Sequence, residues 1–243
     1  MINTLLTSPG NKRALWAWLY VISGLLVSCS PSPILRYAKS DEVLRWEKDI
    51  REFERNDSLE THPEDAVLLT GSSSIRLWSN IEKDMAPYPV IQRGYGGAKI
   101  SDLAVYCRRI IYPHNFKALV VFVANDITGG EHDKEPEEVL ALYQYIVKQV
   151  RKKYAKTPIF FIQITPTNSR WAAWDRISKA NSLIGEYSLK QENLYFIETA
   201  YQFIGANGNP RSELFKEDQL HLNDDGYVIW TRIIKENLDN ILK

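Results

Sequence analysis

Hydrophobic residues recur along this chain in two patterns: short continuous runs, and longer stretches with a spacing of three and four. The short runs are typical of buried strands, and the spaced stretches are typical of helices with one apolar face. Strands are predicted at residues 66–69, 89–92, 118–123, 158–164 and 194–197. Helices are predicted at residues 41–55, 101–111, 136–154, 171–190 and 225–242. The alternation of the two patterns favours a parallel sheet between two helical layers.

The run 118–123 is the most strand-like part of the chain, because it is continuous and β-branched. Such a run is expected of a central parallel strand that is covered on both faces. We therefore predict an α/β fold, a three-layer α/β/α sandwich with a five-stranded parallel sheet.

Polar and small residues follow the first three predicted strands directly. The first strand leads into Gly71-Ser72-Ser73-Ser74, the second into Arg93-Gly94-Tyr95-Gly96-Gly97, and the third into Ala124-Asn125-Asp126. Parallel strands end at one edge of the sheet, where open α/β sheets bind ligands. Ser73, Gly97 and Asn125 are therefore expected at the same edge. Serines also cap helices for structural reasons alone, and a glycine turn also serves a backbone that needs positive φ.

A serine hydroxyl is a weak nucleophile unless a neighbouring base accepts its proton, so the histidines matter. His62 and His114 precede strands and belong to the opposite edge, whereas His132 has no orienting partner at a fixed spacing. His221 follows Asp218 by three residues, so the carboxylate can reach the imidazole Nδ1–H. Asp218 and His221 form the candidate pair for Ser73, although this spacing alone is also typical of a surface loop.

Together these motifs resemble the SGNH (GDSL-type) hydrolase superfamily, in order and at similar separations. The four matching blocks are Gly71-Ser72-Ser73, Gly94-Tyr95-Gly96-Gly97, Val123-Ala124-Asn125-Asp126 and Asp218-Gln219-Leu220-His221. The resemblance covers roughly residues 41–242, and it is closest to a bacterial branch with Gly-Ser-Ser-Ser-Ile-Arg-Leu-Trp in the first block. It implies a flavodoxin-like sandwich and a serine esterase or acylhydrolase that cleaves carboxylic esters through an acyl-enzyme.

The resemblance also implies the role of each site residue. Ser73 would be the nucleophile, His221 the base and Asp218 its orienting acid. The oxyanion would be held by the Ser73 and Gly97 backbone N–H groups and by the Asn125 side chain.

Two positions depart from the family pattern. Ser72 replaces an aspartate, which is ordinary for that branch and removes no catalytic atom. Val123 replaces a glycine, and if that glycine serves a close backbone approach, valine is expected to shift Asn125 or narrow the cleft. The motif also differs from the Gly-x-Ser-x-Gly elbow of α/β-hydrolases, because Ile75 stands at the second glycine position.

The chain has 243 residues, of which 44% are hydrophobic, and its 30 basic residues balance 30 acidic ones. This composition suits one globular domain and argues against nucleic acid as a partner. No histidine or cysteine cluster has the spacing of metal ligands, so no metal or cofactor is expected.

The N-terminus has the pattern of a secretory signal. Lys12 and Arg13 precede an apolar run at 14–27, and Leu26-Val27-Ser28-Cys29 resembles a bacterial lipobox. We expect a signal peptide at 1–28, lipidation of Cys29, a tether at 29–40 and the hydrolase domain at 41–243. The protein would then be lipid-anchored in the bacterial cell envelope. An uncleaved signal anchor is the alternative, although the run is shorter than the ~20 residues that span a bilayer.

Substrate preference is indicated by the residues after the fourth strand. Arg170, Trp171 and Trp174 are expected near the pocket edge, where aromatic faces could stack on a sugar, although at least one tryptophan also suits the helix core. The expected substrate is a small ester, with acetyl on a carbohydrate or a lysolipid as candidates. Two other functions fit the same sequence: a non-catalytic envelope lipoprotein that binds a glycan or protein partner, and an O-acyltransferase.

Overall fold

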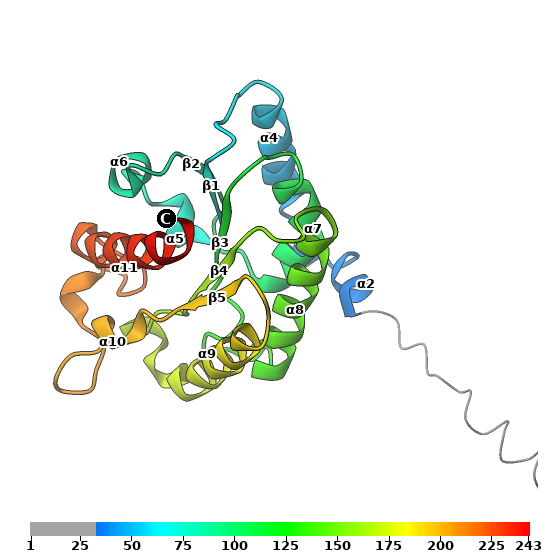
Figure 1. Ribbon diagram of the computed structural model, residues 1–243. Helices are drawn as coiled ribbons and strands as arrows, with labels where there is room; N and C mark the ends of the chain where they lie inside the picture. Colours follow the sequence, from blue (N-terminus) through cyan, green and yellow to red (C-terminus); the bar gives the residue numbers. More distant parts are fainter. Residues whose placement is uncertain (1–32) are drawn as a thin grey trace, which may run out of the picture.

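The computed structural model describes residues 33–243, and its centre is a five-stranded sheet (Figure 1). The strands are β1 (Val67–Gly71), β2 (Val90–Gly94), β3 (Ala118–Phe122), β4 (Ile159–Ile162) and β5 (Leu194–Ile197). All neighbours are parallel, in the order β2-β1-β3-β4-β5. The predicted α/β class and the parallel sheet are therefore confirmed. The strand order reverses between β1 and β3, and such switch points are where doubly wound sheets bind ligands.

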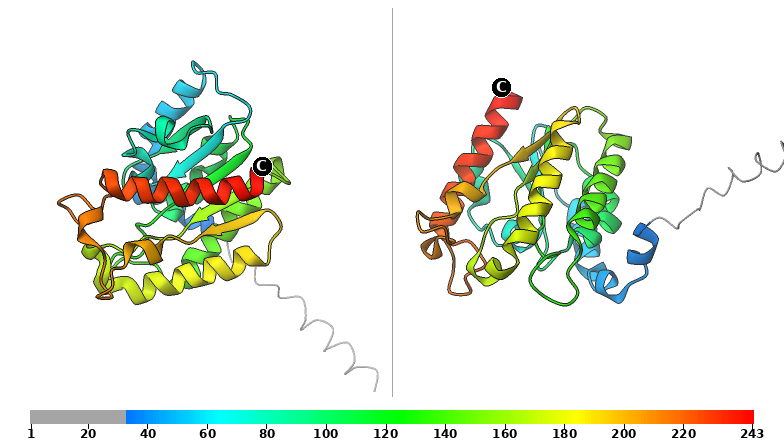
Figure 2. Two further views of the ribbon diagram at one scale, coloured as in Figure 1. Left: turned by 60° about the vertical axis from the view of Figure 1, so that its left-hand side comes forward. Right: turned by 90° about the horizontal axis from the view of Figure 1, so that it is seen from below.

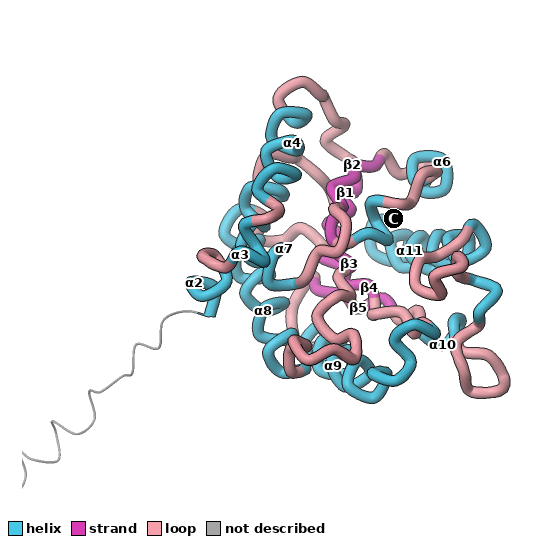
Figure 3. The backbone as a smooth tube through the Cα atoms, turned by 180° about the vertical axis from the view of Figure 1, so that it is seen from behind, coloured by secondary structure: helices cyan, strands magenta, loops and turns pink. Residues whose placement is uncertain are grey.

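Helices cover both faces of the sheet. The α-helices are α2 (Pro33–Tyr37), α3 (Asp41–Leu44), α4 (Glu47–Asp57), α5 (Ser73–Arg76), α6 (Ile81–Met85), α7 (Ile100–Ile111), α8 (Pro136–Lys153), α9 (Trp174–Leu189), α10 (Ala200–Phe203) and α11 (Asp224–Leu242). Two short 3₁₀ helices are η1 (Asn168–Ala173) and η2 (Ser212–Leu214). Helices α4, α7 and α8 lie on one face, and α6 and α11 lie on the other (Figures 1 and 2). Figure 3 shows the same layers from behind, with the strands between them.

Two predicted helices differ from the structure, one in its middle and one at its start. The helix predicted at 41–55 is divided into α3 and α4, because the Trp46 N–H bonds to the Val43 carbonyl in a tighter turn. The helix predicted from residue 171 begins at Trp174, because η1 occupies the preceding turn. Both interruptions lie next to the candidate site.

The domain begins earlier than the predicted boundary at residue 41. Helix α2 packs against α7, and the Tyr37 side chain is buried in the core. The Tyr37 hydroxyl donates to Glu138 of α8. Residues 33–40 of the expected tether are therefore part of the folded domain. The signal peptide and Cys29 lie outside the described residues and stay predictions. Within residues 33–243, no helix is both long and apolar enough to span a membrane.

The core lies between the sheet and its helices. Every residue of β1 and β3 is buried, as expected for central parallel strands. Cys107 packs in this core, and burial raises the pKa of its thiol to about 12. A thiol in such surroundings is inert, so Cys107 serves packing rather than chemistry.

Candidate active site

The exit from β1 is fixed by a backbone conformation that favours glycine. Gly71 has φ +131°, and a Cβ built on it would lie 1.9 Å from the Phe122 carbonyl oxygen of β3. The next residue, Ser72, donates its N–H to that same oxygen at 2.9 Å. The ends of β1 and β3 are thus joined, and the chain turns directly into α5 with Ser73 as its first residue.

Ser73, His221 and Asp218 form one hydrogen-bonded chain. The Ser73 Oγ lies 2.9 Å from His221 Nε2, and His221 Nδ1 lies 2.6 Å from Asp218 Oδ2. Each distance is within hydrogen-bond range, and the order is that of a nucleophile, a base and an orienting acid. Ser73 and His221 are 148 positions apart in the sequence. They meet because α11 and the loop before it pack beside α5.

The loop that carries His221 is closed on itself. Phe215 and Leu222 form an antiparallel bridge, and Gln219 has φ 54° at the tip. Within the loop, Asp218 Oδ1 accepts the backbone N–H groups of Leu220 at 3.0 Å and His221 at 2.9 Å. Partial burial raises the pKa of Asp218, but the His221 side chain and these N–H groups outweigh it and lower the pKa to about 2. Asp218 is therefore ionised at neutral pH and fixed in orientation.

Gly97 and Asn125, the predicted oxyanion residues, meet beside Ser73. Gly97 has φ +70°, which explains why glycine occupies the turn after β2. The Asn125 Nδ2 donates to the carbonyl of Ala98 at 2.8 Å. Because Ala98 directly follows Gly97, this bond holds the two predicted donors close together. Ser73, Gly97, Asn125 and His221 all line the same groove.

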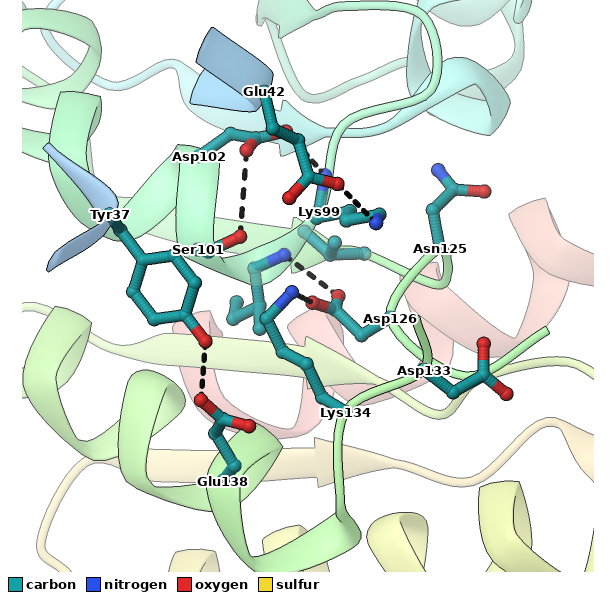
Figure 4. Close-up of polar contacts among 12 residues, drawn as sticks. Tyr37, Glu42, Lys99, Ser101, Asp102, Asn125, Asp126, Asp133, Lys134 and Glu138 are labelled. Atoms are coloured by element: carbon teal, nitrogen blue, oxygen red, sulfur yellow. Dashed lines mark hydrogen bonds and ion pairs between the residues drawn. The ribbon is translucent and has the colours of Figure 1, made fainter. Parts of the chain in front are cut away.

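Two buried carboxylates hold the loop that carries Gly97 (Figure 4). Asp126 Oδ2 accepts the N–H of Ile100 at 2.8 Å, and its other oxygen lies 3.0 Å from Lys134 Nζ. Asp102 Oδ2 accepts the Lys99 N–H at 2.8 Å and the Trp46 indole N–H at 2.9 Å. The beginning of α7 is thus anchored on both sides, immediately after Gly97.

Asp102 gives the domain a measurable pH dependence. Burial raises the pKa of Asp102 to about 6, against the lowering effect of the Lys99 and Trp46 donors. Since an unfolded aspartate titrates near pH 3.9, the native state binds the extra proton between about pH 4 and 6, and the free energy of unfolding falls as pH rises through that window. Asp102→Asn abolishes this titration. We expect the variant to gain up to about 3 kcal/mol relative to wild type between pH 4 and 7.

Denaturant titration of both proteins at several pH values measures this difference. Both donors bind the same oxygen of Asp102, so the asparagine carbonyl can accept them in the variant. Asp126, whose pKa burial also raises, is present in both proteins. Equal pH slopes for the two proteins would show that Asp102 does not titrate in this range.

Two cavities flank Ser73. A small cavity of about 20 Å³ lies over the sheet edge and is lined by both polar and aromatic side chains. Its lining includes Ser73, Phe122, Asn125, Arg170, Phe215, His221 and Trp230. The open groove on the other side has a volume of about 490 Å³ and is lined by Trp46, Asp49, Ser73, Arg76, Gly96, Gly97, Asn125, Leu220 and His221. Both spaces share four lining residues: Ser73, Asn125, Leu220 and His221.

Helix α11 contributes directly to the small cavity. Trp230 forms part of its wall, and the Tyr227 hydroxyl donates to the Ser74 carbonyl at 2.9 Å. Asn223, which caps α11, also donates to the Glu213 carbonyl in η2. The last helix therefore supports the nucleophile turn.

The tryptophan that lines the groove is Trp46, and not Trp171 or Trp174 as predicted. Trp171 and Trp174, both within the described part of the chain, line neither of these two cavities; their rings stack on each other, with centroids 5.6 Å apart. Trp46, which lies within the range of the helix predicted at 41–55, lines the groove instead. Arg170 does line the small cavity, as its position after β4 suggested.

Val123, the departure in the third block, does not obstruct the site. Its side chain is buried in the core and lines neither of the cavities described above. Asn125 reaches the groove with valine in place. Val123 therefore leaves Asn125 in the lining of the groove.

The remaining histidines lie apart from Ser73. His132 is exposed, whereas His62, His114 and Asp57 bring possible ligand atoms within 4.8 Å of one another. Sequence spacing did not indicate this group, because only the fold assembles it. The Arg93 guanidinium bonds to Asp57 and lies 3.2 Å from His62 Nε2, so a side-chain cation already lies among these atoms. Burial lowers the pKa of His114 to about 4.

A doubly wound α/β sandwich with a serine–histidine–aspartate chain at its switch point defines a class, that of serine hydrolases built on a flavodoxin-like sheet. Within this class, the chain belongs to the GDSL-like lipase/acylhydrolase family, whose model matches residues 57–229.

Solved structures share the fold at low sequence identity. A protein from Streptococcus pneumonia, provisionally described as a platelet activating factor, is 19% identical with a TM-score of 0.70, covering 81% of this chain and 94% of its own. A GDSL-like lipase from Bacteroides thetaiotaomicron is 16% identical with a TM-score of 0.65, covering 79% and 97%. An acetyl xylan esterase is 18% identical with a TM-score of 0.56, covering 71% and 99%. Comparison with curated protein sequences gave no match.

Proposed function

We propose that this protein is an esterase that hydrolyses short-acyl carboxylic esters through an acyl-enzyme on Ser73. The observation that carries the proposal is the continuous hydrogen-bonded chain from Ser73 through His221 to Asp218, which opens on a groove shared with Gly97 and Asn125. An ester needs these groups together: a nucleophile, a base that later acts as an acid, and donors for the oxyanion.

In this mechanism the Ser73 Oγ attacks the ester carbonyl carbon while His221 Nε2 accepts the hydroxyl proton. The negative charge that develops on the carbonyl oxygen is stabilised by the Ser73 and Gly97 N–H groups and the Asn125 amide. His221 then gives the proton to the leaving alcohol, and Ser73 retains the acyl group. Water repeats the sequence with His221 as base and releases the acid. Asp218 stabilises the imidazolium in both halves of the reaction.

The small cavity supports a short acyl group. A water molecule needs about 10–15 Å³ of such volume, so a space of about 20 Å³ has room for little more than an acetyl methyl. Its walls include Phe122, Phe215 and Trp230, which are buried aromatic side chains in a packed core. Enlarging the cavity would require these rings to move, at a cost in packing.

We therefore expect the rate to fall steeply with acyl length. A series of p-nitrophenyl esters from acetate to octanoate measures kcat/KM while the leaving group stays constant. Each additional methylene that does not fit the small cavity is expected to raise the activation free energy by about 1–3 kcal/mol. The kcat/KM for butyrate should therefore be at least about tenfold lower than that for acetate. Octanoate hydrolysed as fast as acetate would show that the small cavity does not hold the acyl chain.

The groove supports a large alcohol. Its volume of about 490 Å³ and its open walls, which combine polar and apolar groups, suit a sugar better than a second acyl chain. Trp46 supplies an aromatic surface there, and Asp49 and Arg76 supply polar groups. The fold is also shared with an acetyl xylan esterase. We accordingly propose an acetylated carbohydrate as the substrate class.

A fluorophosphonate probe tests the proposal. The folded domain from residue 33 onward is labelled, digested and analysed by mass spectrometry, and the modified residue is expected to be Ser73. His221→Ala should abolish labelling, because the serine then lacks its base. Folded protein without label, and without release of acetate from acetylated glycans, would favour the alternative of a non-catalytic binding protein. Product analysis with an added acceptor alcohol separates hydrolysis from acyl transfer.

A further inference from the structure

Arg170 has an unusual position for a charged residue. Its guanidinium donates from Nη1 to the Ala124 carbonyl at 2.7 Å and from Nη2 to Asn125 Oδ1 at 2.5 Å. Within residues 33–243 no carboxylate lies within ion-pair distance of it. Burial lowers the pKa of Arg170, and Asp126 and Asp133 raise it from a greater distance. Burying a cation costs free energy unless its donors are well bonded. The position of Arg170 between these two acceptors therefore suggests a specific role.

The bond to Asn125 determines which end of its amide faces the groove. Arginine can only donate, so it selects the carbonyl oxygen Oδ1. The Ala98 carbonyl can only accept, so it selects the amino group Nδ2. Nδ2 has two hydrogens, and the bond to Ala98 uses one of them. The second remains for a ligand in the groove that Asn125 lines.

The segment that carries Arg170 is itself hydrogen-bonded to the loop that carries Asp218 and His221. In η1, the Asn168 side chain donates to Gln219 Oε1 at 2.8 Å, and the Ser169 N–H donates to the Gln219 carbonyl at 3.2 Å. Gln219 lies between Asp218 and His221. One short 3₁₀ turn therefore contacts both the predicted oxyanion residue and the loop that orients the base.

We infer that Arg170 is a positioning residue, which holds the Asn125 carboxamide with Nδ2 toward the oxyanion and strengthens it as a donor. A charge-assisted bond at Oδ1 polarises the amide and makes the remaining N–H a better donor. Without Arg170 the Ala98 carbonyl alone holds the amide, so its orientation is less tightly fixed and its Nδ2 is a weaker donor. This inference rests on the proposed esterase function, and it assigns to Arg170 a role that acts through Asn125, in addition to its place in the lining of the small cavity.

A double-mutant cycle tests this dependence. Kinetics with p-nitrophenyl acetate are measured for wild type, Arg170→Ala, Asn125→Ala and the double variant. We expect Arg170→Ala to lower kcat by about 10- to 100-fold with KM nearly unchanged, which is less than the loss of the donor itself. In the Asn125→Ala background the same change should cost less than about twofold, because the group that it positions is gone.

Rescue and a matched control complete the design. Arg170→Lys should recover part of the rate, because its ammonium can still donate to Asn125 Oδ1, and added guanidinium should partly restore Arg170→Ala. Arg151 is the control, since burial lowers its pKa as well and its guanidinium donates to backbone carbonyls, those of Tyr154, Thr157, Glu192 and Asn193. Arg151→Ala should lower stability and leave kcat unchanged.

The possible outcomes separate the two ideas. If Arg170→Ala does not fold, Arg170→Lys enters the same cycle and must show the same dependence on Asn125. Equal losses in both backgrounds, or an unchanged kcat, would overturn the role of Arg170 while leaving the esterase intact. A folded wild-type protein without esterase activity would refute the proposed function, and the inference that depends on it as well.

Discussion

Replacing Ser73 with alanine is expected to lower kcat for a short ester by at least about 10⁴-fold, the scale seen when a catalytic triad loses its nucleophile. The hydroxyl removed is the atom that lies 2.9 Å from His221 Nε2, so the base has no oxygen left to activate except that of water. The oxyanion donors remain in place, and they account for the residual rate above the uncatalysed reaction. KM should change little, because one oxygen atom contributes little to binding the alcohol.

Initial rates with p-nitrophenyl acetate, corrected for spontaneous hydrolysis, measure this loss. Ser182→Ala is a suitable control, because Ser182 is an exposed serine on α9 whose hydroxyl bonds only to its own helix at Ser178. A Ser73→Ala protein that kept more than a tenth of the wild-type rate would exclude an acyl-enzyme on this residue.

The second large effect is expected at Asn125. Asn125→Ala should lower kcat by about 10²–10³-fold and leave KM within about threefold, because a donor aimed at developing charge acts in the transition state. Asn125→Asp should be more damaging, since it places a carboxylate where negative charge forms. Steady-state kinetics on a soluble acetyl ester separate kcat from KM.

Asn237→Ala serves as the control for this change. Asn237 is a partly buried asparagine of α11 that donates to the Ile233 carbonyl, away from Ser73. A rise in KM at constant kcat in Asn125→Ala would mean that the residue binds the ground state and is not an oxyanion donor.

The sequence predicts the sheet and the edge that carries the site, for a physical reason. Parallel strands buried on both faces need continuous apolar runs, and the residues after each run must share one edge. The order of apolar runs and polar residues therefore suffices to place Ser73, Gly97 and Asn125 together. Asp218 and His221 join them through their local spacing and the family resemblance.

Other parts of the site could not be predicted, because they depend on contacts between distant segments. A helical period shows that Trp46 faces inward, but it does not distinguish a core from a groove. Arg170 reaches Asn125 across 45 positions of sequence, and no periodic pattern marks such a bond. The cluster of Asp57, His62 and His114 has the same origin, since its members come from a helix end and two loops.

The contribution of α11 to the small cavity has a consequence for how this protein is made. Trp230 closes the cavity and Tyr227 bonds to the carbonyl after the nucleophile, yet both lie in the last helix of the chain. His221 also precedes that helix by only a few residues. A chain that has been synthesised only as far as residue 217 contains Ser73 but lacks Asp218, His221 and α11. Under the proposed function, ester cleavage therefore requires the domain to extend through the loop that carries His221 and into α11.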